Sequence, residues 1–121
     1  MSMQAYPLRG YLIPFTLENM KKLDLEEESE PLFELDLHAF VDVSDDEAEI
    51  IEKFIEAFQK KWRMTPEIIY LSDEVEGCEG AAESGQTFLC FSERDKFTMT
   101  TRPEWAVLPV KPEESLWVER G

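Results

Sequence analysis

Apolar and polar residues alternate one by one over residues 32–43, which is the clearest periodic signal in this chain of 121 residues. One set of alternate positions is wholly apolar and contains Phe33, Leu35, Leu37, Ala39, Val41 and Val43. The other set is mostly polar and contains Glu34, Asp36, His38, Phe40 and Asp42. A period of two predicts a strand with one buried face and one face in water.

The period changes after Ser44, where apolar residues recur every three or four positions and predict an amphipathic helix over about 45–64. Ser44 and Glu47 have the spacing of a capping box, and Pro66 ends the helix because proline cannot continue it. Acidic residues at its start and basic residues at its end suit the helix dipole. The apolar stripe contains Ala48, Ile51, Phe54, Ile55, Phe58 and Trp62.

Shorter signals predict the elements before residue 32. Residues 8–15 favour a strand, which Pro14 would confine to an edge or a bend of the sheet. Thr16 can cap a short helical turn over Leu17, Met20 and Leu23. Residues 24–31 indicate an acidic loop that ends at Pro31.

Beyond the long helix, the pattern indicates strands separated by turns. We expect strands at 67–72 and 87–92, a hairpin partner at 97–101, and a further strand at 105–110. The glycine-rich acidic stretch at about 73–86 is typical of a mobile loop. Residues 112–120 fit either one helical turn beginning at Pro112 or an extended segment.

One long helix among many strands predicts an α+β protein with a single domain over residues 1–121. We expect one mostly antiparallel sheet of four to six strands, with the helix packed on one face. A doubly wound sheet is not expected, because it needs strands and helices in regular alternation.

Acidic residues dominate the charge: 27 acids against 12 bases give a net charge of −15. Residues 24–56 alone hold 14 acids and one base, Lys53. Such a charge repels nucleic acid and anionic membranes and attracts basic protein surfaces. Acidity also keeps proteins in solution, and that purpose alone explains the composition equally well.

The sequence contains no catalytic or metal-binding motif. His38 is the single histidine, no metal-ligand spacing accompanies it, and no cofactor is expected. Cys78 and Cys90 are too few for a disulfide framework; whether they pair stays open, and Cys90 fits a small core position. Because no secretory leader or membrane span is visible, we expect a cytoplasmic protein. Because no catalytic motif is present, we expect that it is not an enzyme.

A partner surface is the remaining hypothesis, carried by acidic side chains and one aromatic ring from the first half of the chain. If they lie together, they would suit a basic surface that normally binds nucleic acid. Immunity-type inhibitors and antagonists from phages or mobile elements use charge in this way. The candidate residues are Glu26, Glu27, Glu28, Glu34, Asp36, His38, Phe40, Asp42, Asp45, Asp46 and Glu49.

The alternative is a self-associating accessory or structural protein whose acidity serves only solubility. In that case Trp105, Leu116 and Trp117 would form the surface of a homodimer.

Overall fold

Five antiparallel strands form one open sheet in the order β2-β4-β1-β5-β3 in the computed structural model, which describes residues 5–35, 44–91 and 103–120. This α+β fold confirms the expected class and the expected antiparallel sheet. The strands are β1 (Ala5–Pro14), β2 (Glu67–Leu71), β3 (Glu76–Glu79), β4 (Gln86–Cys90) and β5 (Glu113–Arg120).

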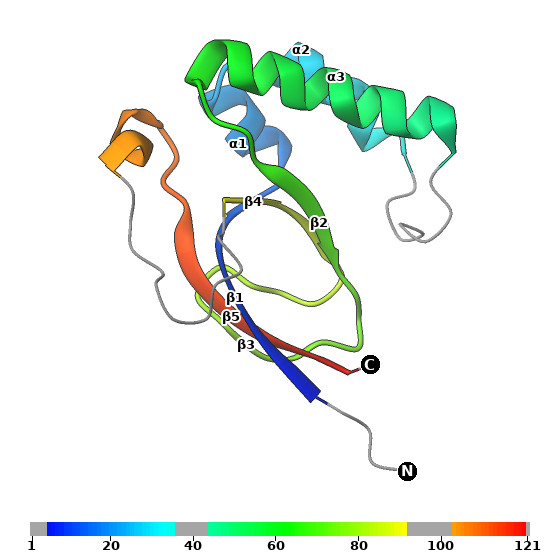
Figure 1. Cartoon of the computed structure of the whole chain (residues 1–121), viewed down its shortest axis with the longest axis vertical. Helices are drawn as coiled ribbons and strands as arrows, with labels where there is room; N and C mark the ends of the chain where they lie inside the picture. The colour runs from blue at the N-terminus through cyan, green and yellow to red at the C-terminus, as the bar shows by residue number, and fades with distance from the viewer. Residues whose placement is uncertain (1–4, 36–43, 92–102, 121) are drawn as a thin grey trace.

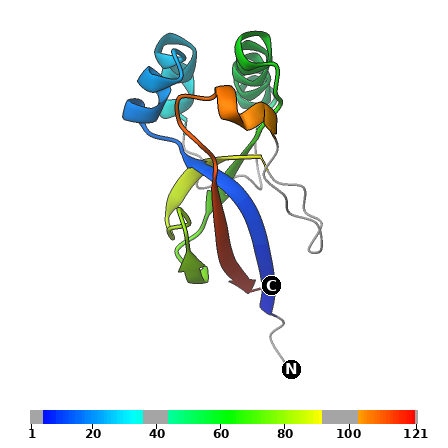
Figure 2. The same cartoon turned by 90° about the vertical axis from the view of Figure 1, so that its left-hand side faces the viewer.

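Three helices lie together on one side of this sheet (Figures 1 and 2). They are α1 (Leu17–Lys22), α2 (Glu26–Phe33) and α3 (Asp45–Trp62). We call them the helical layer. A short 3-10 helix, η2 (Pro103–Val107), precedes β5.

The longest helix, α3, forms as the sequence predicts. The Ser44 hydroxyl accepts a hydrogen bond from the backbone N–H of Glu47 at 3.2 Å and donates one to the Glu47 carboxylate at 3.1 Å. Its other end closes at Arg63, which has a left-handed backbone (φ 62°). Phe54 and Phe58 are buried beneath it. The stripe therefore faces the sheet, and the helix ends two residues before Met64.

The core on the helix side of the sheet is built by every second residue of β1 and its extension. Tyr11, Ile13 and Phe15 point to this side and pack in one cluster with Phe54 and Phe58. Trp105 of η2 joins them, with its ring centroid 4.7 Å from that of Tyr11. We call this cluster the helix-side core.

A second, smaller cluster closes the opposite face of the sheet. Intervening residues such as Leu12 of β1 and Phe88 of β4 point to this side. Val75 and Ala82, from the chain between β2 and β4, pack against them. We call this cluster the far-side core. Cys90 is buried in it, which confirms its predicted core position, and neither Cys90 nor Cys78 is in a disulfide bond.

The expected loop at 24–31 and the beginning of the expected strand at 32–43 are wrong, because Glu26–Phe33 forms α2. Leu25, Ser29 and Leu32 have no exposed surface, and their spacing of four and three places them on one helical face. Burial of this face against the other helices outweighs the presence of Pro31 inside the helix. Residues 36–43 lie outside the described part of the chain.

Three expectations near the sheet edges are corrected. β1 is an inner strand between β4 and β5, and Pro14 is tolerated because it is the last residue of the strand. The segment 73–86 contains β3, which pairs with β5, so it is not wholly a loop. Residues 105–107 belong to η2, whose Trp105 turns into the core.

The remaining expectations concern the last third of the chain. β2 and β4 occupy the predicted segments, and residues 113–120 take the extended alternative as β5. β4 pairs with β1 and β2. Its expected hairpin partner at 97–101 lies outside the described residues.

Candidate functional site

The helices α2 and α3 lie side by side in opposite directions within the helical layer. The start of α2 meets the end of α3 through two contacts. The Lys61 ammonium donates to both the backbone oxygen and the carboxylate of Asp24, each at 2.6 Å. The Trp62 indole N–H donates to the backbone oxygen of Leu23 at 3.0 Å. These contacts hold the beginning of α2 close to the end of α3.

The outer face of α3 carries a row of four carboxylates. Asp45, Glu49, Glu52 and Glu56 are separated by four, three and four residues, which places them on one side of a helix. All four are exposed, whereas Phe54 and Phe58 are buried on the opposite side. The amphipathic pattern that fixes the core thus also aligns these acids toward solvent.

The helix α2 carries a second set of exposed carboxylates. Its exposed carboxylates are Glu26, Glu27, Glu28 and Glu30, and Glu34 follows as the exposed C-cap. Glu30 is four residues from both Glu26 and Glu34, a spacing at which like charges repel. Because α2 has no basic residue, nothing within this helix relieves the repulsion. We call the exposed carboxylates of α2 and α3, with Glu34, the acidic surface.

Lysines neutralise this surface only in part. Lys21 pairs with Glu26 at 3.9 Å and Lys53 pairs with Glu49 at 3.4 Å. Among the described residues, no lysine or arginine lies within 4.0 Å of the carboxylates of Glu52 or Glu56. The central turns of α3 therefore present carboxylates that are open to an external cation.

An aromatic ring borders the acidic surface at the end of α2. Phe33 is 43% exposed, and its ring stacks at a tilt on Phe15 with the centroids 4.6 Å apart. It lies three residues after Glu30, on a neighbouring part of the helix surface. An exposed ring beside charges supplies the apolar contact that a purely acidic surface lacks. The alternating pattern had placed Phe33 on the buried face of a strand.

The structure places seven of the predicted site residues on exposed parts of the helical layer or directly beside it: Glu26, Glu27, Glu28, Glu34, Asp45, Asp46 and Glu49. Asp36, His38, Phe40 and Asp42 lie outside the described residues. The sequence reasoning missed Glu30, Phe33, Glu52 and Glu56. The spacing of 45, 49, 52 and 56 was a signal that could have identified the two residues on α3.

Two of the three residues expected to form a homodimer surface are buried within the fold. Trp105 and Trp117 are each about 5–6% exposed and belong to the helix-side core and the far-side core, respectively. Both rings therefore pack against residues of their own chain. Only Leu116 of the predicted set remains half-exposed.

No group of three or more histidine, cysteine, aspartate or glutamate side chains in the described ranges is arranged to hold a metal ion. Within those ranges, no helix combines the length and apolar character needed to cross a bilayer.

Comparison with known proteins adds no relative to these observations: no family model, curated protein or solved structure matches the chain.

Proposed function

We propose that this protein is a non-catalytic binding module whose acidic surface occupies a basic surface on a partner protein. The observation that supports this function is the row of exposed carboxylates on α3, which runs antiparallel to a second acidic helix. A row of fixed negative charges attracts a basic partner during diffusion and suppresses contact with acidic proteins. Phe33 at the border supplies an apolar contact for the docked complex.

The partner that best fits this proposal is a protein that binds nucleic acid. Its binding site is basic, since it neutralises phosphates with lysine and arginine. Carboxylates spaced along two helices can take the place of those phosphates. The protein would then act as an antagonist or immunity-type inhibitor, in the setting of a phage or another mobile element.

A pair of variants with equal charge tests the proposal. One carries Glu49→Gln, Glu52→Gln and Glu56→Gln on the acidic surface, and the control carries Glu74→Gln, Glu83→Gln and Glu113→Gln, which are exposed residues elsewhere. Both lose three negative charges. Each is immobilised, exposed to a cell lysate at low salt, and eluted with high salt or with duplex DNA.

We expect a basic protein that the unmodified chain and the control retain and that DNA displaces. The variant of the acidic surface should bind it roughly tenfold more weakly, since each exposed ion pair contributes about 0.2–1 kcal/mol. Equal retention by the two variants would mean that the position of the removed charges is irrelevant and that net charge alone determines binding. Absence of any salt-sensitive basic partner would favour the alternative, in which acidity serves solubility.

A further inference from the structure

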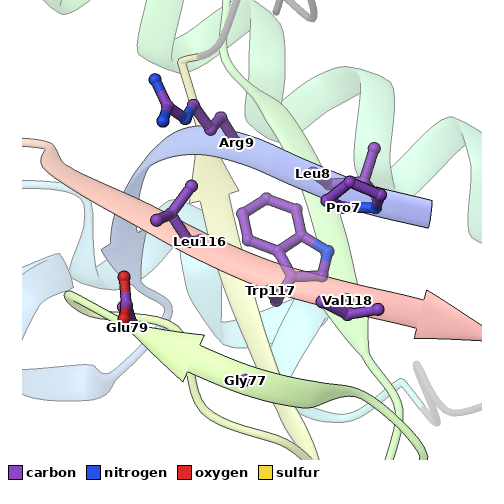
Figure 3. A pocket seen from close by; sticks show the side chains of 8 residues that line it. All are labelled: Pro7, Leu8, Arg9, Gly77, Glu79, Leu116, Trp117 and Val118. Atoms are coloured by element: carbon purple, nitrogen blue, oxygen red, sulfur yellow. The ribbon is translucent and has the colours of Figure 1, made fainter. Parts of the chain in front are cut away.

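An open groove of about 470 Å³ lies on the part of the sheet formed by β1, β5 and β3 (Figure 3). This part of the sheet extends away from the helical layer (Figures 1 and 2). The groove has the volume of a small-ligand site, for which about 300–1,000 Å³ is usual. Its lining residues are Pro7, Leu8, Arg9, Gly77, Glu79, Leu116, Trp117 and Val118.

Two opposite charges stand on the two sides of the groove. Arg9 of β1 and Glu79 of β3 are both paired in register with Leu116 of β5, which lies between them (Figure 3). Directly paired residues point to the same face of a sheet. Neighbouring strands are spaced by roughly 4.8 Å, so the Cα atoms of Arg9 and Glu79 are roughly 10 Å apart.

These two charges do not neutralise each other or find another charged partner. Within the described ranges, neither the Arg9 guanidinium nor the Glu79 carboxylate lies within 4.0 Å of an opposite charge. Both residues are exposed. The groove therefore presents one cation and one anion, separated by apolar surface.

The surface between the charges is apolar and only partly covered. Leu116 and Val118 of β5 are half-buried and Pro7 of β1 is exposed, and their register with Arg9 places them on its face of the sheet. Gly77 has no side chain, so the side of the groove formed by β3 is shallow at this position. Apolar contact with a ligand would remove this surface from water, which is favourable.

We propose that the groove binds a short apolar peptide of two or three residues, with its carboxylate on Arg9 and its ammonium group on Glu79. Each extended residue spans about 3.3–3.6 Å, so three residues are about as long as the roughly 10 Å between the two Cα atoms, and the two long, exposed side chains must turn toward the ends of the peptide. A ligand with only negative charge would be repelled by Glu79 and by the net charge of −15. A ligand with only positive charge would be repelled by Arg9. A zwitterion satisfies both residues, and this site is independent of the acidic surface.

The experiment is isothermal titration calorimetry of the full chain with the tripeptide Leu-Ala-Leu, its N-acetylated form and its C-amidated form. We expect the free tripeptide to bind and each blocked form to bind about tenfold more weakly, because each loses one charge-assisted hydrogen bond. NMR spectra recorded during the titration should show shifts in β1, β3 and β5. Equal binding of the three peptides, or no binding at millimolar concentration, would overturn the proposal.

Two variants assign the ends of the peptide. Arg9→Gln should weaken binding of the free tripeptide about tenfold and leave binding of the amidated form unchanged. Glu79→Gln should weaken binding of the free tripeptide about tenfold and leave binding of the acetylated form unchanged. Glu74→Gln, a change of equal charge outside the groove, is the control and should have no effect. If the tripeptide instead dissociates a dimer of the chain, the occupant is a second copy and the peptide site is refuted.

Discussion

The two faces of the sheet are both closed by apolar side chains, but by different kinds of structure. On the helix side, α3 lays a regular stripe of large residues over Tyr11, Ile13 and Phe15. On the far side there is no helix among the described residues. There, Val75 and Ala82 from the chain between β2 and β4 cover Leu12, Phe88 and Trp117 with little volume.

The two cores are therefore stabilised in different ways. The helix-side core depends on the size of its side chains, because aromatic rings fill it. The far-side core depends on backbone fit, because the covering chain is held close to β5 by a tight turn at Gly80 and by a hydroxyl. Ser115 is buried, and its hydroxyl accepts a hydrogen bond from the Ala81 N–H at 3.0 Å. Substitutions that distinguish volume from backbone fit should therefore affect the two faces differently.

The largest effect is expected from Phe58→Ala in the helix-side core. Phe58 is fully buried and packs beside Phe54 and Phe91. Loss of its ring removes apolar contacts and leaves a cavity, so we expect the free energy of unfolding to fall by about 3–5 kcal/mol. Urea denaturation measures this loss. Val107→Ala, at a 64% exposed position, is the control, and an equal loss there would contradict the assignment of the core.

A substitution at Gly80, in the turn beside the far-side core, should cost somewhat less. Gly80 has a φ of 70°, and a Cβ added to it would overlap the backbone oxygen of Glu114. Gly80→Ala should lower the free energy of unfolding by about 2–4 kcal/mol, from the strained φ and the clash together. Gly77→Ala has nearly the same φ (61°) but only ordinary contact with Val118. It should cost about 1–2 kcal/mol in the same denaturation assay, and equal costs would rule out the clash.

The smallest effect is expected from substitutions of the two buried serines, which lie on opposite sides of the sheet. Ser115→Ala should lower the free energy of unfolding by about 1–3 kcal/mol, because it leaves the Ala81 N–H without its partner. The Ser29 hydroxyl donates to the backbone oxygen of Glu26, an oxygen that a helix also satisfies internally. Ser29→Ala should therefore change the stability by less than about 0.5 kcal/mol. Thermal unfolding of both variants measures the contrast, and a reversed order would refute it.

The helix-side core was largely predictable from the sequence, and the reason is its periodicity. The stripe from Ile51 to Trp62 repeats over about three turns, and Ser44 marks the beginning of the helix. Local spacing and capping determine such a helix almost without reference to the remaining chain. The three exposed acids on α3 that were predicted followed from this helix.

Other parts of the fold depend on contacts that local patterns do not reveal. α2 is short, contains Pro31, and forms because Leu25 and Leu32 are buried against other helices. β3 has no alternation of apolar residues and becomes a strand only by pairing with β5, which lies over thirty residues later. The exposed ring of Phe33 was missed for the same reason, since the error in α2 reversed its predicted face.

The pairing of β1 with β5 also determines the order in which the fold can be completed during synthesis. Ala5 is in register with Arg120, so the ladder joins residues at nearly the greatest separation in this chain. β1, β2 and β4 all precede β5 in the chain, so they can assemble while one edge of β1 is still unpaired. Ladders between such distant residues slow folding, and an unpaired edge invites association with other chains. A partly folded chain in which β5 has not yet docked on β1 is therefore the species most exposed to aggregation.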